Sequence, residues 1–147
     1  MLKYDSQDGA PISNNPIVIS YQPLEEGYKY YFAVQAVDLA GNASAYGNGD
    51  GIRVDTGKPV IVNLFDDGNY GIERDKLHVC WEAEKSISNI IEFQYAVAST
   101  ASPTNLNWRS AGLNRNIVIQ PQDVGLMEFA PGAAWYVFVR ALNEAGT

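Results

Sequence analysis

The sequence has a single cysteine, Cys80, and a single histidine, His78, among its 147 residues. One cysteine excludes a disulfide within the chain, and one histidine leaves few of the usual ligands for a zinc site. Basic residues are also few, because ten Lys and Arg stand against 17 Asp and Glu and the formal net charge is -7. Nucleic-acid binding rests on clustered basic side chains, so this composition disfavours a nucleic acid as partner.

Long apolar runs are missing as well. No stretch approaches the roughly 18 consecutive apolar residues that a membrane-spanning helix requires, so we expect no membrane insertion within this segment. The first ten residues contain one lysine and no apolar run of the signal-peptide kind, so we expect any export signal to lie outside this chain. What the chain does contain is 46% hydrophobic residues with nine Tyr, five Phe and three Trp, which is the composition of a folding chain rich in strand-forming residues.

Short alternating apolar runs, separated by Gly, Pro, Asn and Asp, predict an all-β protein. No stretch of ten or more residues has a convincing helical period. Many short strands with regular turns are typical of a sandwich or a barrel. The expected strands are residues 15–21, 28–37, 51–55, 58–65, 76–83, 90–99, 116–120 and 134–142.

One sequence pattern occurs twice in this chain. The stretch YKYYFAVQAVDLAGNAS begins at Tyr28, and a similar stretch, WYVFVRALNEAGT, begins at Trp135. Tyr30 and Trp135 take equivalent places 105 residues apart, a plausible length for one sandwich domain with its linker. Strand alternation turns one set of side chains inward in each copy. These sets are Tyr30, Phe32, Val34 and Ala36 in the first copy and Trp135, Val137, Val139 and Ala141 in the second.

Both copies resemble strand F of the fibronectin type III module, an immunoglobulin-like β-sandwich. The first copy supplies Leu24, Gly27, Tyr30, Phe32, Val34, Ala36, Asp38 and Gly41 of the family pattern, and the second supplies Phe129, Pro131, Gly132, Trp135, Val137, Val139, Ala141, Asn143 and Gly146. Upstream, LHVCWEA resembles the family's strand B and EFQYAVA its strand C. The resemblance implies tandem modules: residues 1–57 as the C-terminal part of a first module that is incomplete at its N-terminus, and residues 58–147 as a second module lacking strand G.

Two departures from the family pattern are informative. Trp135 stands where the family has a tyrosine whose hydroxyl ties the corner between strands E and F, and an indole N–H can donate but cannot accept. Tyr30 keeps that hydroxyl in the first copy. The joints between repeats are similar to those of large bacterial secreted and surface proteins.

The resemblance also predicts the core and the behaviour of the chain. In the second module we expect the core to contain Leu77, Val79, Trp81, Tyr95, Val97, Val137 and Val139. We expect Asp55 to Pro59 to be a short linker that limits bending, since Pro59 fixes its own φ and restricts Lys58. An unpaired strand F and an uncovered apolar row predict aggregation, strand exchange between copies or loose order in the first 55 residues.

No catalytic constellation is predicted, and we interpret the segment as non-catalytic. The only histidine, His78, lies mid-strand on the outward face beside Cys80, whereas reactive groups concentrate on loops and strand ends. Two ligands at this spacing are too few to fix a metal. Four carboxylates near the domain joint are calcium candidates, although ordinary turn roles are favoured because their spacing lacks an EF-hand pattern. These candidates are Asp50, Asp55, Asp66 and Asp67.

Outward aromatic residues are the candidates for a binding surface. Tyr31 in the first copy, and Tyr136 with Phe138 in the second, could stack on sugar rings or contact a partner protein. Cross-strand packing within the sheet is the favoured alternative.

The leading functional prediction is therefore a non-catalytic spacer or binding module of a multidomain extracellular protein, secreted or attached to the cell surface. Its partners would be neighbouring domains of the same polypeptide, and carbohydrate or protein ligands. We keep two alternatives: accessory modules of a secreted polysaccharide-degrading enzyme whose catalytic domain lies elsewhere, and a calcium-stiffened adhesin. The fold alone names no ligand, because this scaffold carries many unrelated sites.

Overall fold

The computed structural model describes residues 23–68, 73 and 75–147. Contacts divide the chain into two units that meet between Val54 and Asp55. The strand expected at residues 15–21 lies outside the described residues. No helix in the described part of the chain has the length and apolarity needed to cross a membrane.

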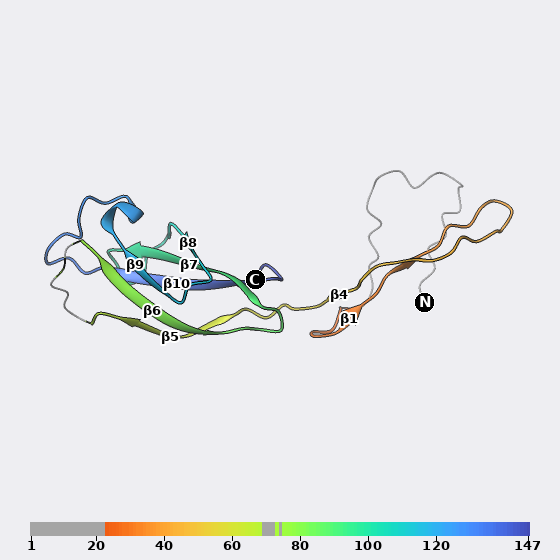
Figure 1. Cartoon of the computed structure of the whole chain (residues 1–147), viewed down its shortest axis with the longest axis horizontal. Coiled ribbons are helices and arrows are strands. Elements are labelled where there is room, and N and C mark those ends of the chain that lie inside the picture. The colour runs from red at the N-terminus through yellow and green to blue at the C-terminus, as the bar shows by residue number, and fades with distance from the viewer. Residues whose placement is uncertain (1–22, 69–72, 74) are drawn as a thin grey trace. The chain divides into compact units, whose positions relative to one another are not determined.

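The first unit contributes one long antiparallel hairpin, drawn in orange and yellow in Figure 1. An isolated bridge between Val37 and Ala43 lies next to its turn. Strand β1 pairs with β4 and β2 pairs with β3, so the expected strand at residues 28–37 is present as two short pieces. The four strands are β1 (Lys29–Tyr30), β2 (Ala33–Val34), β3 (Gly47–Asn48) and β4 (Ile52–Arg53).

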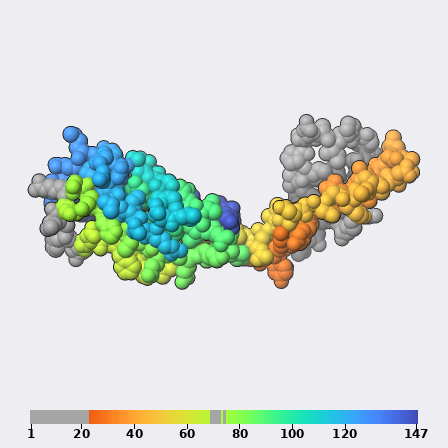
Figure 2. All heavy atoms as spheres, viewed as in Figure 1, coloured from red at the N-terminus to blue at the C-terminus, as the bar shows by residue number. Residues whose placement is uncertain are grey.

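The row of residues expected to face inward in this hairpin is largely exposed. Val34 is 71% and Phe32 52% exposed, and only Tyr30 is half-buried. A two-stranded ribbon has no second layer against which to bury one of its faces. The described residues of this unit form such a ribbon, which is narrow in the space-filling view of Figure 2.

The second unit contains two three-stranded antiparallel sheets, with orders β5-β6-β9 and β10-β7-β8 (Figure 1). The strands are β5 (Val60–Asp66), β6 (Leu77–Glu84), β7 (Ile90–Ala98), β8 (Arg109–Gly112), β9 (Asn116–Ile119) and β10 (Tyr136–Asn143). The prediction of an all-β fold is confirmed, and these antiparallel sheets are consistent with a β-sandwich.

One apolar core joins the two sheets of the second unit. The ring of Trp81 on β6 meets that of Phe93 on β7 edge to face, with 5.6 Å between centroids. Trp81 and Tyr95 are buried as expected, while Val97, Val137 and Val139 are partly buried against the core. The buried members are Val79, Trp81, Phe93, Tyr95, Ala111, Ile119, Phe129 and Ala141. Inward residues of both sheets therefore fill a shared interior.

Three elements were not predicted from the sequence. Strands β3 and β8 are short, and the segment between β9 and β10 contains one 3-10 turn, η1 (Pro121–Val124). Pro121 begins this turn, where its missing N–H costs nothing, and Gly125 ends it with φ 79°. The turn brings Val124 and Leu126 against the core.

Candidate functional site

The carboxylate of Asp55, at the start of the second unit, accepts hydrogen bonds from five donor groups. Its Oδ2 accepts hydrogen bonds from the Ser86 hydroxyl at 2.9 Å, from the Ser88 amide at 2.8 Å and from the Ser88 hydroxyl. Its Oδ1 accepts one from the Gly57 amide at 3.0 Å. The loop that precedes β7 supplies both serines, so this carboxylate fixes the entering chain to that loop.

Asn143 at the end of β10 completes the arrangement. It is fully buried, and its Nδ2 donates to the Ser86 hydroxyl at 2.9 Å, the Gly57 carbonyl at 3.0 Å and Asp55 Oδ2 at 3.3 Å. The Thr147 hydroxyl also donates to the Gly57 carbonyl, at 2.7 Å. We call these six residues the Asp55 cluster: Asp55, Gly57, Ser86, Ser88, Asn143 and Thr147.

Hydrogen bonding makes the charged form of Asp55 the favoured one. The Ser88 hydroxyl and amide, with the Ser86 hydroxyl and the Gly57 amide, lower its pKa from 3.8 to about 2, although desolvation opposes them. The absence of a side chain at Gly57 allows the entering chain to pass close to Ser86, because an added Cβ would lie 3.0 Å from Cβ of Ser86. Neutral donor groups alone therefore stabilise the Asp55 carboxylate, which is typical of a structural arrangement. A cation at this place would meet only carboxylate oxygens that already accept hydrogen bonds from the protein.

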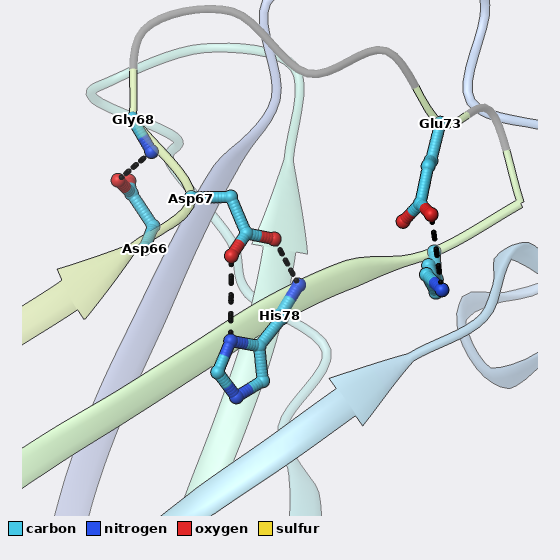
Figure 3. A network of polar contacts seen from close by, with 6 residues as sticks. Asp66, Asp67, Gly68, Glu73 and His78 are labelled. Atoms are coloured by element: carbon cyan, nitrogen blue, oxygen red, sulfur yellow. Dashed lines mark hydrogen bonds and ion pairs between the residues drawn. The ribbon is translucent and has the colours of Figure 1, made fainter.

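The other three calcium candidates take part in none of the hydrogen bonds of this cluster. Asp50 is exposed in the first unit, and Asp66 uses Oδ1 to accept the Gly68 amide at 2.9 Å. Asp67 lies beside His78, with 3.4 Å between its Oδ1 and the ring Nδ1 and 3.3 Å between its Oδ2 and the His78 amide (Figure 3). Within the described residues, no three His, Cys, Asp or Glu side chains gather where they could hold a metal ion.

His78 is exposed, as expected for the outward face of its strand, and Cys80 is half-buried. Figure 3 shows Asp67 reaching across to β6 from the end of β5, while Lys76 pairs with Glu73 at 3.1 Å. The contact between Asp67 and His78 links the end of β5 to the beginning of β6, as contacts near a turn between two paired strands do. Sequence reasoning placed His78 on the correct face but did not foresee its acidic neighbour.

The outward aromatic residues have different surroundings in the two units. Tyr31 is 67% exposed, and its ring lies over Gly51, where an added Cβ would stand 2.7 Å from Cε1. Lys29 Nζ lies 5.3 Å from the centre of the same ring. In the second unit Tyr136 is 39% exposed and Phe138 half-buried. Tyr31 therefore packs across its own hairpin over a glycine, which is a strand-stabilising contact.

A polar chain that sequence reasoning missed lies on the β10-β7-β8 sheet. The Arg140 guanidinium sits 4.3 Å from the centre of the Trp108 ring, and its Nε donates to Gln94 Oε1 at 2.8 Å. Gln94 in turn donates to Glu92 at 3.1 Å. The stacking of Arg140 on Trp108 carries no local sequence signal because the two residues come from separate segments.

Tyr30 and Trp135, which occupy matching places in the two similar stretches of sequence, make different contacts. In the first unit the Tyr30 hydroxyl accepts a hydrogen bond from the Glu25 amide at 2.9 Å. In the second unit Nε1 of Trp135 is buried and has no hydrogen-bond partner among the residues that the structure describes. The Trp135 ring instead packs edge to face against Phe129, with centroids 5.4 Å apart. Apolar packing against Phe129 is thus the contact that the Trp135 ring makes where Tyr30 has a hydrogen bond.

An open groove of about 590 Å³ lies beside Trp135. Its lining combines apolar groups with the hydroxyl and amide groups of the loop that follows β7, and no charged side chain takes part. It is lined by Val97, Ala98, Ser99, Thr100, Ser102, Pro103, Thr104, Asn105, Val124, Leu126 and Trp135. Such a lining can donate and accept hydrogen bonds but supplies no general acid or base.

Comparison with known proteins adds no relative. No protein-family model matches the chain, and no curated protein is similar to it in sequence.

Proposed function

We propose that residues 55–147 act as a non-catalytic spacer module of a multidomain extracellular protein, in tandem with a preceding module to which residues 23–54 belong. The Asp55 cluster is the observation that carries this proposal. A spacer has to hold the entering chain in a fixed direction, and five donor groups bind the Asp55 carboxylate just inside the boundary between the units. A residue expected to lie in the linker is thereby an anchored part of the module.

The sheet topology supports placing the module among the fibronectin type III-like sandwiches. In immunoglobulin-type sandwiches strands A, B and E share one sheet, and C and F share the other. The orders β5-β6-β9 and β10-β7-β8 agree with this scheme when β5, β6 and β9 are A, B and E and when β7 and β10 are C and F. The Tyr30 hydroxyl bond to Glu25 is the corner contact that the resemblance implies.

The spacer role is tested by measuring how widely the two units range relative to each other. Fluorophores attached through cysteines at Tyr46 and Leu113, both exposed, would report the distribution of distances in a chain whose Cys80 is replaced by serine. We expect Asp55→Ala to broaden this distribution and Asp50→Ala, at an exposed carboxylate of the first unit, to leave it unchanged. An equally broad distribution in the parent chain and in Asp55→Ala would contradict the proposal.

A further inference from the structure

The turn that follows β10 shares three hydrogen bonds with the turn of the first-unit hairpin. In the first unit the Asp38 amide donates to the Asn42 carbonyl and the Gly41 amide to the Asp38 carbonyl, each at 3.0 Å. The Asn42 amide also donates to Asp38 Oδ1 at 2.8 Å. Gly41 has φ 86°, which favours glycine because the left-handed region is strained for other residues.

Each of these bonds recurs 105 residues later. The Asn143 amide donates to the Thr147 carbonyl at 3.3 Å, and the Gly146 amide donates to the Asn143 carbonyl at 3.0 Å. The Thr147 amide donates to Asn143 Oδ1 at 3.0 Å, and Gly146 has φ 79°. The repeat is therefore structural as well as sequential, and the turn at the end of β10 directs a chain back along that strand as a hairpin turn does.

The edge along which this turn points has no strand partner among the described residues. Strand β10 pairs with β7 only, and its sheet has the order β10-β7-β8. The Glu144 amide bonds to the Asn89 carbonyl, on the β7 side, whereas the Asn143 amide bonds to Thr147. Because successive amides along a strand point to opposite edges, the returning chain would run along the edge of β10 that faces away from β7.

This edge also lacks the features with which proteins guard their sheet edges. From Tyr136 to Leu142 the strand pairs with β7 without a break in register, and Arg140 is its only charged residue. The other edge strands are less suited to accept a partner, since β8 and β9 have four residues each and the pairing of β5 with β6 is interrupted between Ile61 and Asn63. Long, regular and weakly charged edges are templates for strand addition.

We propose that the edge of β10 that has no strand partner among the described residues accepts, as an antiparallel strand, residues 43–54 of a second copy of this chain. The same residues pair with the equivalent of β10 in the first-unit hairpin, so their sequence already suits this partner. No residue of that hairpin is fully buried among residues 23–54, and its strands are paired over only two residues at a time. Releasing residues 43–54 from the hairpin would therefore expose little additional apolar surface. Exchange of one element between identical chains is a low-cost route to association.

The register follows from the first unit. There, Ala33 lies opposite Asn48 and Val34 opposite Gly47. Adding 105 to the acceptor positions places Phe138 opposite Asn48 of the second copy and Val139 opposite its Gly47. Phe138 is half-buried and Asn48 exposed, so the pair at these two positions is open to chemical trapping.

The pairing is tested by mixing two proteins that each carry one cysteine. Because neither chain has a second cysteine, a disulfide can form only between two chains. One protein carries Asn48→Cys and the other Phe138→Cys, both with Cys80→Ser, and the mixture is oxidised mildly and analysed by mass spectrometry. We expect covalent heterodimer in several-fold excess over random pairing. The matched control replaces Phe138→Cys by Leu113→Cys, a position 64% exposed and outside the strands, and should pair only randomly.

Hydrogen exchange of the unaltered chain supplies the second measurement. Amides on the open edge of β10, such as those of Val139 and Ala141, should become several-fold more protected as protein concentration rises, while those paired with β7 should not change. The proposal is overturned if the heterodimer is no more frequent than in the control, or if open-edge protection does not depend on concentration.

Discussion

The side-chain amide of Asn143 lies 3.0 Å from the carbonyl oxygen of Gly57 and joins two residues that are 86 positions apart in the sequence. Asn143 has no exposed surface, and its Oδ1 accepts both the amide and the hydroxyl of Thr147 at 3.0 Å. A buried amide with satisfied donors and acceptors couples the entering chain to the end of β10.

Removing the Asn143 amide should destabilise the second unit strongly. In Asn143→Ala the Gly57 carbonyl and the Ser86 hydroxyl lose a buried donor, so we expect a loss of about 2–4 kcal/mol in the free energy of unfolding. Urea denaturation followed by tryptophan fluorescence measures it. Asn105→Ala, at an exposed loop position, is the matched control and should change the free energy by less than about 0.5 kcal/mol. Equal effects of the two substitutions would contradict the assigned role.

Acid should weaken the Asp55 cluster over a defined range of pH. Folding lowers the pKa of Asp55 from 3.8 to about 2, so the carboxylate contributes stability that is fully present above about pH 4. This contribution is lost as the pH falls toward 2. Urea midpoints at pH 7, 4, 3 and 2 should therefore converge for the parent chain and Asp55→Asn, with the variant less stable at pH 7. A constant difference between the two over the whole range would exclude this titration as the cause. Asp50→Asn serves as the control for surface charge.

The edge-to-face pair of Trp81 and Phe93 should dominate the apolar contribution of the core. Phe93 is 2% exposed, so Phe93→Ala removes a large buried side chain and should cost about 3–5 kcal/mol. Phe65 is 52% exposed, and Phe65→Ala should cost less than about 1 kcal/mol. Thermal unfolding of both variants measures the contrast. A similar loss in both would indicate that the core lies elsewhere.

Replacing Trp135 by tyrosine should give the second unit a hydrogen bond like the one that the Tyr30 hydroxyl accepts in the first unit. The equivalent of the Glu25 amide in the second repeat is the amide of Ala130, at the same 105-residue interval. Trp135→Tyr would remove a buried donor without a partner and place a hydroxyl acceptor near that amide. We expect a gain of about 1 kcal/mol in stability and slower hydrogen exchange at Ala130. Trp135→Phe should show neither slower exchange at Ala130 nor the part of the gain that depends on the hydroxyl.

Calcium should leave the melting temperature unchanged. Among the described residues no three acidic side chains gather where they could hold a metal ion, and the oxygens of Asp55 already accept hydrogen bonds from protein donors. A ligand that binds the folded state raises the melting temperature by mass action. Scanning calorimetry in millimolar calcium and in chelator compares the two conditions. A clear rise in the melting temperature with calcium would contradict this expectation and support the alternative of a calcium-stiffened adhesin.

Much of the second unit could be predicted because its long strands carry their own signal. Alternation of apolar and polar residues located β6, β7 and β10 within two residues at each end. Strand β8 has the sequence RSAG, whose local pattern is that of a loop, and it is a strand only because it lies beside β7. Phe93 follows from the alternation that placed Tyr95 inward, although it was not included in the expected core.

The Asp55 cluster could not have been found in this way. The sequence indicates a turn aspartate or a calcium ligand at this position, because carboxylates near Gly and Pro are common in both. Four of its five donor groups come from Ser86, Ser88 and Asn143, which lie 31, 33 and 88 residues away. No local pattern encodes contacts over such separations. The same holds for Arg140 and Trp108. These two residues come together only because β10 pairs with β7 and because the loop before β8 lies beside them.

The Asp55 cluster also determines how the second unit would carry a mechanical load. Tension applied at Val54 would reach the body of the unit first through Asp55 and Gly57, and so pass directly into the end of β10 rather than peel β5 from β6 one pair at a time. Several hydrogen bonds would then have to break together before the strands separate. The unit is consequently arranged to resist stretching at its point of entry, and Ser86, Ser88 and Asn143 are the residues that bear the force.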